Sequence, residues 1–277
     1  MNRFVFYLLF FGVLFCNTLP ARCMLPGHVD IYAHPPRTIR VCCLFGSQVG
    51  ITGLPFIKLT AVTSPEKIGR HYFMGKYSEN NGLIYTRRGG FIDMGHLRDI
   101  ADWTAWIYAL IQKEQAIGCI KLCLGYGGGV KILEISVPPG ISDEDMLLLA
   151  GRIAYDISVW HEIATWFGVS SVPLVPEQFS SFSVEDTYSN LLGVLLGMEA
   201  IRSKQSYEEA MTDLIREKLV ELEAVRSETE TLDALESVRD VWWTRNAHLP
   251  SNKVAIVRQT KVYETIYPLL VPGESPL

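Results

Sequence analysis

A histidine and three aspartates follow one another at short intervals where a long helix is predicted to begin. Over residues 95–115, helical spacing places His96 and Asp99 on the apolar face of that helix. Asp93 precedes the helix, and Asp102 lies at the edge of the same face. Imidazole and carboxylate groups bind divalent metals such as zinc, and they also act as general acids and bases. We therefore predict a metal site at Asp93, His96 and Asp99 or an acid/base pair. The alternative is a polar network that caps the helix and satisfies a buried ring.

A second candidate group lies near the end of a helix predicted over residues 142–167. His161 and Glu162 resemble half of the helix motif of zinc proteases, but Thr165 stands where the second histidine of that motif is required. The zinc-protease pattern is therefore incomplete. Because this helix is apolar on nearly all sides, we expect it to be central and Glu162 to need a polar partner, which suits a general base.

A third polar group opens the next predicted helix, at residues 180–190. Ser183 followed by Asp186 is typical of a helix-capping arrangement, and a helix start also favours anions. If the three groups converge in the fold, they form an acidic pocket. The candidate catalytic residues are then His96, Asp99, Glu162, Glu185 and Asp186.

The elements that must position these groups follow from hydrophobic periodicity and from glycine and proline positions. The pattern predicts helices over 95–115, 142–167, 183–202, 206–226 and 229–245, a hairpin of 117–124 with 130–137, and extended segments at 254–257 and 267–271. We expect an α+β fold with a mainly helical core and a small antiparallel sheet or hairpin, as one domain over residues 24–277.

The composition disfavours two classes of protein, and the first residues predict where the chain is located. The 277 residues are 48% hydrophobic and carry a net charge of −5, which disfavours both disorder and nucleic-acid binding. Residues 4–15 form an unbroken apolar run typical of a secretory signal, so we expect residues 1–23 to direct export to the periplasm or the outer membrane. Cys23 offers lipidation as a second route, and membrane contact is expected only through such a lipid anchor. The alternative is an uncleaved membrane anchor.

The remaining cysteines leave two interpretations open. Cys42 and Cys43 are adjacent, and Cys119 and Cys123 lie on one face of a predicted strand, too far apart to bond each other. A disulfide between the two pairs suits an oxidising compartment. A nucleophilic thiol at Cys42 or Cys43, beside His71 or His96, is the other interpretation.

Several long motifs resemble one family of bacterial proteins. These are RVCCLFG at 40–46, GRHY at 69–72, NGLIYTRRGGFID at 81–93, GHLRDIADW at 95–103, EIATWFG at 162–168 and SFSVEDTYSN at 181–190. Together they resemble domain-of-unknown-function family 4056 (DUF4056) over roughly residues 38–272. The resemblance implies exported proteins of Gram-negative bacteria, often lipoproteins, with no settled activity and no catalytic residue to carry over.

Two function classes fit these observations. The first is an envelope hydrolase that uses the His/Asp/Glu group with or without a divalent metal, acting on an envelope substrate that the sequence does not identify. The second is a non-catalytic binding or scaffold protein, in which the same residues only cap helices and tie them together.

Overall fold

The computed structural model describes residues 35–36, 40, 49–50, 58–59, 62–124, 131–169, 177–245 and 253–273. Its helices are α1 (Met94–Glu114), α2 (Asp143–Trp166), α3 (Val184–Arg202), α4 (Tyr207–Glu221) and α5 (Glu228–Ser237), with short 3-10 turns η1 (Tyr77–Glu79) and η2 (Glu177–Phe179). The strands form antiparallel pairs, β1 (Val49–Gly50) with β2 (Lys58–Leu59), β3 (Leu83–Thr86) with β4 (Gly90–Asp93), β5 (Cys119–Leu124) with β6 (Lys131–Ser136), and β7 (Trp243–Arg245) with β8 (Lys253–Ala255). The predicted α+β class, mainly helical with small antiparallel pairs, is confirmed.

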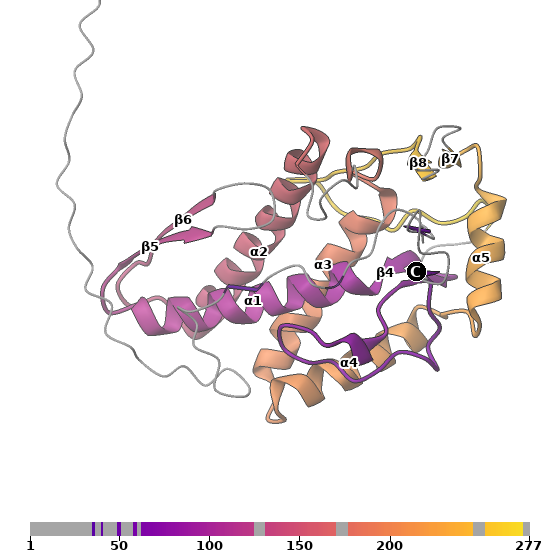
Figure 1. The fold of residues 1–277 in the computed structure, drawn as a ribbon. Coiled ribbons are helices and arrows are strands. Elements are labelled where there is room, and N and C mark those ends of the chain that lie inside the picture. Colours follow the sequence, from indigo (N-terminus) through magenta and orange to yellow (C-terminus); the bar gives the residue numbers. More distant parts are fainter. Residues whose placement is uncertain are drawn as a thin grey trace, which may run out of the picture.

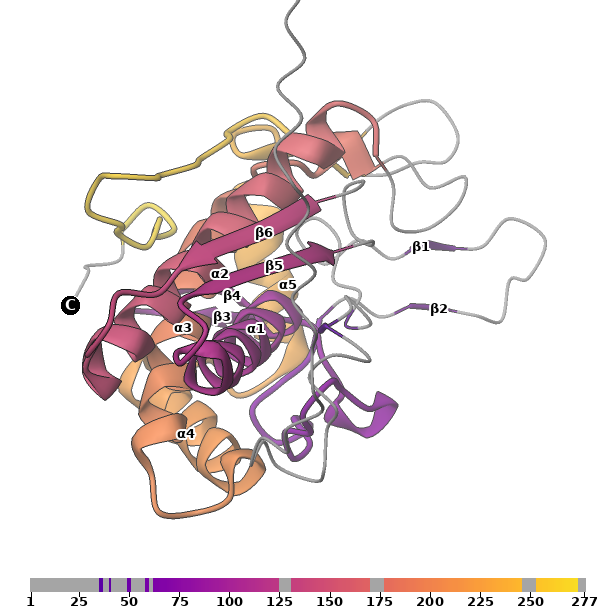
Figure 2. The same ribbon diagram turned by 90° about the vertical axis from the view of Figure 1, so that its left-hand side faces the viewer.

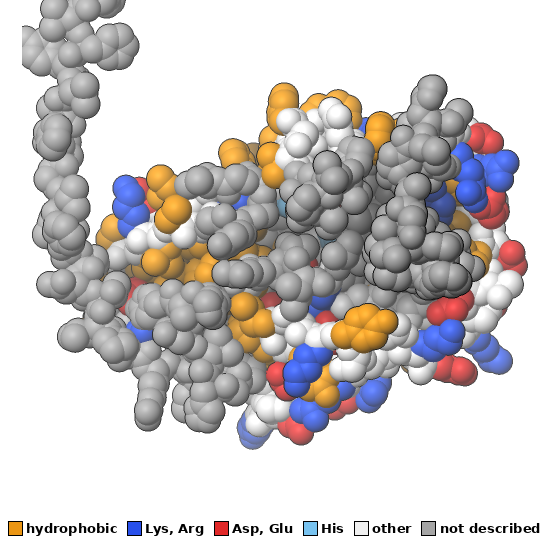
Figure 3. Space-filling model, viewed as in Figure 1, with side chains coloured by type: hydrophobic (Ala, Val, Ile, Leu, Met, Phe, Trp, Pro, Cys, Tyr) orange, Lys and Arg blue, Asp and Glu red, His pale blue; other side chains and the backbone are white. Residues whose placement is uncertain are grey.

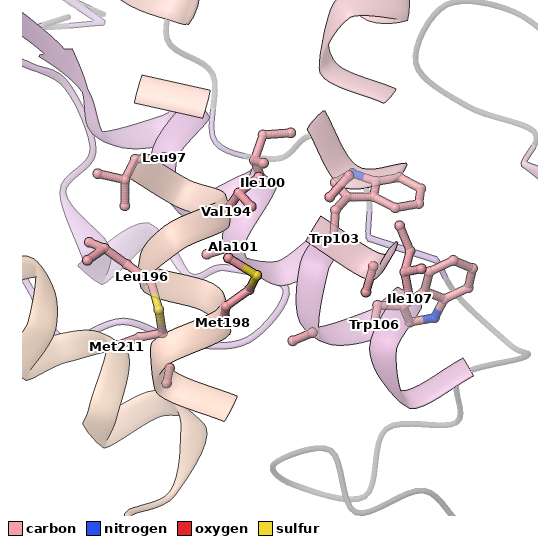
Figure 4. Close-up of a cluster of buried hydrophobic side chains, with 14 of the residues drawn as sticks. Leu97, Ile100, Ala101, Trp103, Trp106, Ile107, Val194, Leu196, Met198 and Met211 are labelled. Carbon is pink, nitrogen blue, oxygen red and sulfur yellow. The ribbon is translucent and has the colours of Figure 1, made fainter. Parts of the chain in front are cut away.

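Helix α1 is the central element of the fold. It packs against both α2 and α3, and Figure 1 shows it crossing the molecule between the β5–β6 hairpin and the β3–β4 pair. Figure 2 views α1 almost along its axis, with α2, α3 and the hairpin arranged around it. Most of its side chains are buried, including Trp106, Ile107 and Leu110. The close-up in Figure 4 shows Ile100 and Ala101 of α1 beside Val194 and Met198 of α3. We expected α2 to be central, and this was wrong, because its Trp160, Ile163 and Trp166 are exposed.

Two glycines allow α1 and α3 to approach each other closely. A Cβ added at Gly193 would lie 2.3 Å from the carbonyl oxygen of Leu97, and one at Gly197 would lie 3.0 Å from the Cα of Ala101. A larger residue at position 193 would force the two backbones apart, since real Cβ atoms do not approach a carbonyl oxygen this closely. This contact sets α1 and α3 side by side near the ends that carry the polar residues.

A second, smaller core lies beyond the start of α1. It joins the β3–β4 pair to α5 and to the β7–β8 pair through Leu83, Phe91, Leu235, Trp242 and Trp243. The indole Nε1 of Trp243 donates a hydrogen bond of 3.0 Å to the carbonyl of Leu235. This core fixes β4, the strand that leads directly into α1.

Two predicted helix ends are wrong at the carboxyl-terminal side. The helix predicted over 206–226 ends at Glu221, because Glu223 takes a left-handed backbone (φ 55°) and the chain there pairs with residues beside β3. The helix predicted over 229–245 ends at Ser237, since the left-handed Asp240 (φ 60°) turns the chain into β7. The segment 267–271, predicted as extended, is neither helix nor paired strand in the structure.

The structure tests only part of what we predicted for the cysteines and for the membrane. Cys119 and Cys123 lie in β5 as predicted, and both are exposed free thiols, so the expected disulfide through them is not present. Cys42, Cys43 and the apolar run at 4–15 lie outside the described residues. In the part of the chain that is described, no helix has the length and hydropathy that a bilayer crossing requires.

Candidate metal and acid–base site

The amino-terminal end of α1 carries the first two members of the site. Asp93 ends β4 and caps α1, since its Oδ1 accepts hydrogen bonds from the backbone nitrogens of Gly95 (2.8 Å) and His96 (3.0 Å). This cap satisfies backbone donors that every helix start leaves open. It also places the Asp93 carboxylate beside the first helical turn, where the half-buried His96 ring emerges.

The start of α3 supplies the third member. The Oδ1 of Asp186 lies 3.6 Å from Nδ1 of His96, and the Oδ1 of Asn190 lies 3.3 Å from the same nitrogen. The hydroxyl of Ser189 accepts a hydrogen bond of 2.9 Å from the backbone nitrogen of Asp93 and donates one of 2.6 Å to the carbonyl of Glu185. The two helix starts are therefore tied together directly.

Asp93, His96 and Asp186 form a group suited to hold a metal ion. Each offers one ligand atom, and these atoms lie within 4.8 Å of one another. One imidazole and two carboxylates suit zinc or manganese. We predicted Asp99 as the third ligand; the structure places Asp186 there instead, and Asp99 turns to a different partner. The predicted contact between His96 and Asp99 is absent from the hydrogen bonds and ion pairs of the described residues.

Ser183 occupies the N-cap position of α3 as predicted, but the expected side-chain cap is missing. Its side chain makes no cap hydrogen bond to the start of α3, and its hydroxyl instead donates to Oε2 of Glu185 at 2.5 Å. The Asp186 carboxylate is thereby left facing His96.

Helix α2 places Glu162 and His161 beside the group of Asp93, His96 and Asp186. The Oε2 of the buried Glu162 accepts a hydrogen bond of 2.5 Å from the backbone nitrogen of Phe182, and the His161 ring centroid lies 6.4 Å from that of His96. The three polar groups predicted from the sequence therefore converge, with α1, α2 and α3 each contributing one.

Burial and crowded acids shift the pKa values of this site. Burial raises the pKa of Asp186 well above its usual range, and the charges of Glu162, Glu185 and Asp93 raise it further. Burial likewise raises the pKa of Glu162, even though the charge of His96 and the hydrogen bond from Phe182 oppose that shift. Both carboxyls thus hold their protons to a higher pH than ordinary acidic side chains do.

The two histidines respond in opposite directions. Burial disfavours the charged form of His96, but the surrounding carboxylates, Asp93 and Glu162 foremost, outweigh it and raise the pKa of the ring. Burial lowers the pKa of His161 to about 4, and the charges of His96 and Lys131 act in the same direction. His161 is therefore neutral near pH 7, while His96 holds its proton to a higher pH than an ordinary histidine.

A comparison with protein families assigns this chain at the family level. The model of the family described as "Protein of unknown function (DUF4056)" matches residues 31–272, a span that contains the whole site. The chain belongs to the DUF4056 family. No curated protein and no solved structure matches it significantly. The family assignment confirms the resemblance of the motifs, and it carries no catalytic residue to this DUF4056 protein.

One cation of the DUF4056 site was missed from the sequence. Arg258, beyond β8, donates through Nη1 to the carbonyl of Ser181 and through Nη2 to that of Phe179 (3.3 Å), and it stacks on Trp166 at 4.9 Å. Its charge and that of Glu162 attract each other, although burial is the larger effect and lowers the pKa of Arg258. No local pattern in the sequence singles out this arginine, since its partners are backbone carbonyls far along the chain.

Asp99 belongs to a second buried cluster of the DUF4056 protein. Arg40 contacts Glu79 at 2.7 Å, Asp102 at 2.9 Å and Asp99 at 3.0 Å. His71 Nε2 lies 3.0 Å from Asp102. Because one guanidinium serves three carboxylates, burial prevails at Asp99 and raises its pKa to about 7, while Arg40 and then His71 outweigh burial at Asp102 and lower its pKa.

Proposed function

We propose that Asp93, His96 and Asp186 bind a divalent metal ion and that the protein is a metal-assisted hydrolase. The observation that carries the proposal is the state of the Asp186 carboxylate. It is buried, it lies next to three other carboxylates, and His96 is the only polar side chain that pairs with it among the described residues. A buried carboxylate without sufficient compensation is costly, and a cation held between Asp93, His96 and Asp186 supplies that compensation.

Glu162 is the candidate general base. It lies close enough to His96 for their charges to interact, and its raised pKa makes it a stronger base than an ordinary glutamate, which suits a group that takes up a proton and returns it to a leaving group. The backbone hydrogen bond from Phe182 holds Oε2 and fixes the orientation of the carboxylate. A divalent ion bound here would supply Lewis acidity and lower the pKa of a bound water to about 7.

His161, Glu185 and Asn190 would support this chemistry without binding the ion. The neutral His161 offers a hydrogen-bonding group on the side of His96 that faces α2. Glu185 is held by Ser183, and Asn190 contacts His96 Nδ1. We assign them as positioning residues.

Metal content tests the proposal. The purified protein is incubated with zinc or manganese, dialysed and analysed by inductively coupled plasma mass spectrometry, alongside Asp186→Asn, His96→Ala and the exposed control Asp233→Asn. We expect about one ion per chain in the wild type and the control, and loss of the ion in both site variants. A wild type that retains neither metal would overturn the proposal.

A non-catalytic binding or scaffold role is the second candidate. Two contacts that stabilise the fold favour this role: Asp93 caps α1, and Ser189 in α3 hydrogen-bonds the backbone of Asp93. In that case His96→Ala lowers the midpoint of thermal unfolding and changes no metal content. A stable His96→Ala variant that has lost a bound metal rejects this role.

We also propose that the mature chain is exported, with residues 1–23 as its signal. The apolar run at residues 4–15 supports this, and Cys23 supports a lipid-anchored form. The mass of the protein recovered from separated cell fractions distinguishes a cleaved, a lipidated and an uncleaved product.

A further inference from the structure

A mostly apolar groove lies between the β5–β6 hairpin and α2. Its volume is about 330 Å³, within the range of roughly 300–1,000 Å³ typical of small-ligand sites. The apolar lining includes Leu124, Leu133, Ile153, Ile157 and Trp160. In Figure 3 hydrophobic side chains gather over the part of the molecule where Figure 1 places the hairpin and α2. An exposed apolar groove of this kind is typical of a ligand-binding surface.

Among the described residues, the groove carries one positive charge that no carboxylate neutralises. Two charged residues line it, Lys131 and Asp156. The carboxylate of Asp156 is paired with Arg152 at 2.9 Å on the same helix. Lys131 makes no ion pair within the part of the chain that the structure describes, and burial lowers its pKa to about 8. An ammonium group left without a partner in an apolar groove favours a ligand that brings an anion.

The groove adjoins the candidate metal site. Trp160 lines the groove and is followed in α2 by His161 and Glu162, which face the site. The charge of Lys131 contributes to the lowered pKa of His161, so the two side chains lie within electrostatic reach. His161 therefore interacts electrostatically with both Lys131 and His96.

We propose that this groove binds an aliphatic acyl chain, with the carboxylate or carbonyl end of the chain at Lys131. This inference rests on the proposed hydrolase function for the reaction itself. The substrates of that hydrolase would be acyl esters or amides. Hydrolysis adds a water oxygen to the acyl carbonyl carbon, breaks the C–O or C–N bond, transfers one water proton to the leaving group and releases the other to solvent. The product is a carboxylate, the anion that suits Lys131, with its alkyl chain along the apolar lining.

Binding of decanoate to the metal-free protein tests the groove by itself. Isothermal titration calorimetry compares decanoate, octanoate and decylammonium, all below their micelle concentrations. We expect decanoate to bind more tightly than octanoate, by about fourfold per methylene, which corresponds to ~0.8 kcal/mol. Decylammonium should bind at least tenfold more weakly than decanoate. Equal binding of decanoate and decylammonium, or no binding of decanoate, overturns the inference.

Matched variants locate the binding site. Lys131→Met should weaken decanoate binding at least tenfold, and Leu133→Trp, which fills the groove, should abolish it. Lys121→Met is the control, because Lys121 lies on the neighbouring strand with an exposed side chain paired with Glu134. Circular dichroism confirms that each variant is folded. Unchanged decanoate binding in both groove variants contradicts the proposed location.

The proposal for the metal site and the proposal for the groove can be tested separately. Asp186→Asn should lose the metal and still bind decanoate like the wild type. A protein that binds decanoate through Lys131 but never retains a metal rejects the hydrolase and leaves the groove as an acyl-binding site. If the protein retains the metal but does not bind decanoate, only the proposed acyl-binding role of the groove is rejected.

Discussion

The carboxylate of Asp186 lies 3.6 Å from Nδ1 of His96, although the two residues come from the starts of different helices, α3 and α1. The approach depends on Gly193, whose missing Cβ lets the backbone of α3 meet that of α1. The candidate metal site is therefore a consequence of helix packing, and its stability and its chemistry can be tested separately.

A bound metal should stabilise the protein in a pH-dependent manner. The proposed ligands Asp186 and His96 have raised pKa values, so each must release its proton before an ion binds, and affinity should increase from pH 6 to pH 8. Zinc at about 100 times its dissociation constant should add about 2.7 kcal/mol to the free energy of unfolding. Thermal unfolding with zinc or with a chelator at both pH values measures this. A shift of the same size in Asp186→Asn would contradict the assignment.

Gly193→Ala should destabilise the fold and disturb the site. The new methyl group would lie 2.3 Å from a backbone carbonyl of α1, which cannot move aside as a side chain can. We expect a loss of about 1–3 kcal/mol in urea unfolding, typical of overpacking. Gly151→Ala is the matched control in α2, since its methyl group would meet the movable side chains of Val194 and Met198. Equal losses in the two variants would disprove the argument.

Arg40→Met should be strongly destabilising. The substitution leaves the carboxylates of Glu79, Asp99 and Asp102 without their shared guanidinium in a buried cluster. Removal of one partner from a buried ion network costs about 3–5 kcal/mol, which urea unfolding at pH 7 can detect. Arg216→Met is the control, because its pair with Asp213 is exposed and contributes little. A loss no larger than that of the control would show that the cluster does not stabilise the fold.

Asp99 should make stability depend on pH. Its pKa is raised to about 7, above the value of about 3.9 in an unfolded chain, so the folded state binds the extra proton between these pH values. The stabilisation from its neutral form is complete below about pH 4 and is lost as the pH rises towards 7. Asp99→Asn should therefore become more stable relative to the wild type over pH 4–7 and show no further relative change above it. Urea unfolding at pH 4.5, 6, 7 and 8 tests this; a constant difference would contradict it.

Local patterns predicted the elements whose causes are local. The Asp93 cap, the α1 helix over 94–114 and the β5–β6 hairpin all follow from residues near one another in the chain. The boundaries near Glu223 and Asp240 were missed, because a left-handed residue and a distant pairing partner ended helices that the spacing alone would continue.

The sequence by itself determined which side chains could do chemistry and the apolar helix faces on which they lie. Only the tertiary structure decided which carboxylates meet. His96 and Asp99 share a helix face. The close packing of α1 on α3 nevertheless places His96 next to Asp186, while Asp99 pairs with Arg40. Periodicity orients a side chain about its own helix axis. Its partner depends on which helix packs there, and that is set by the packing of the whole core.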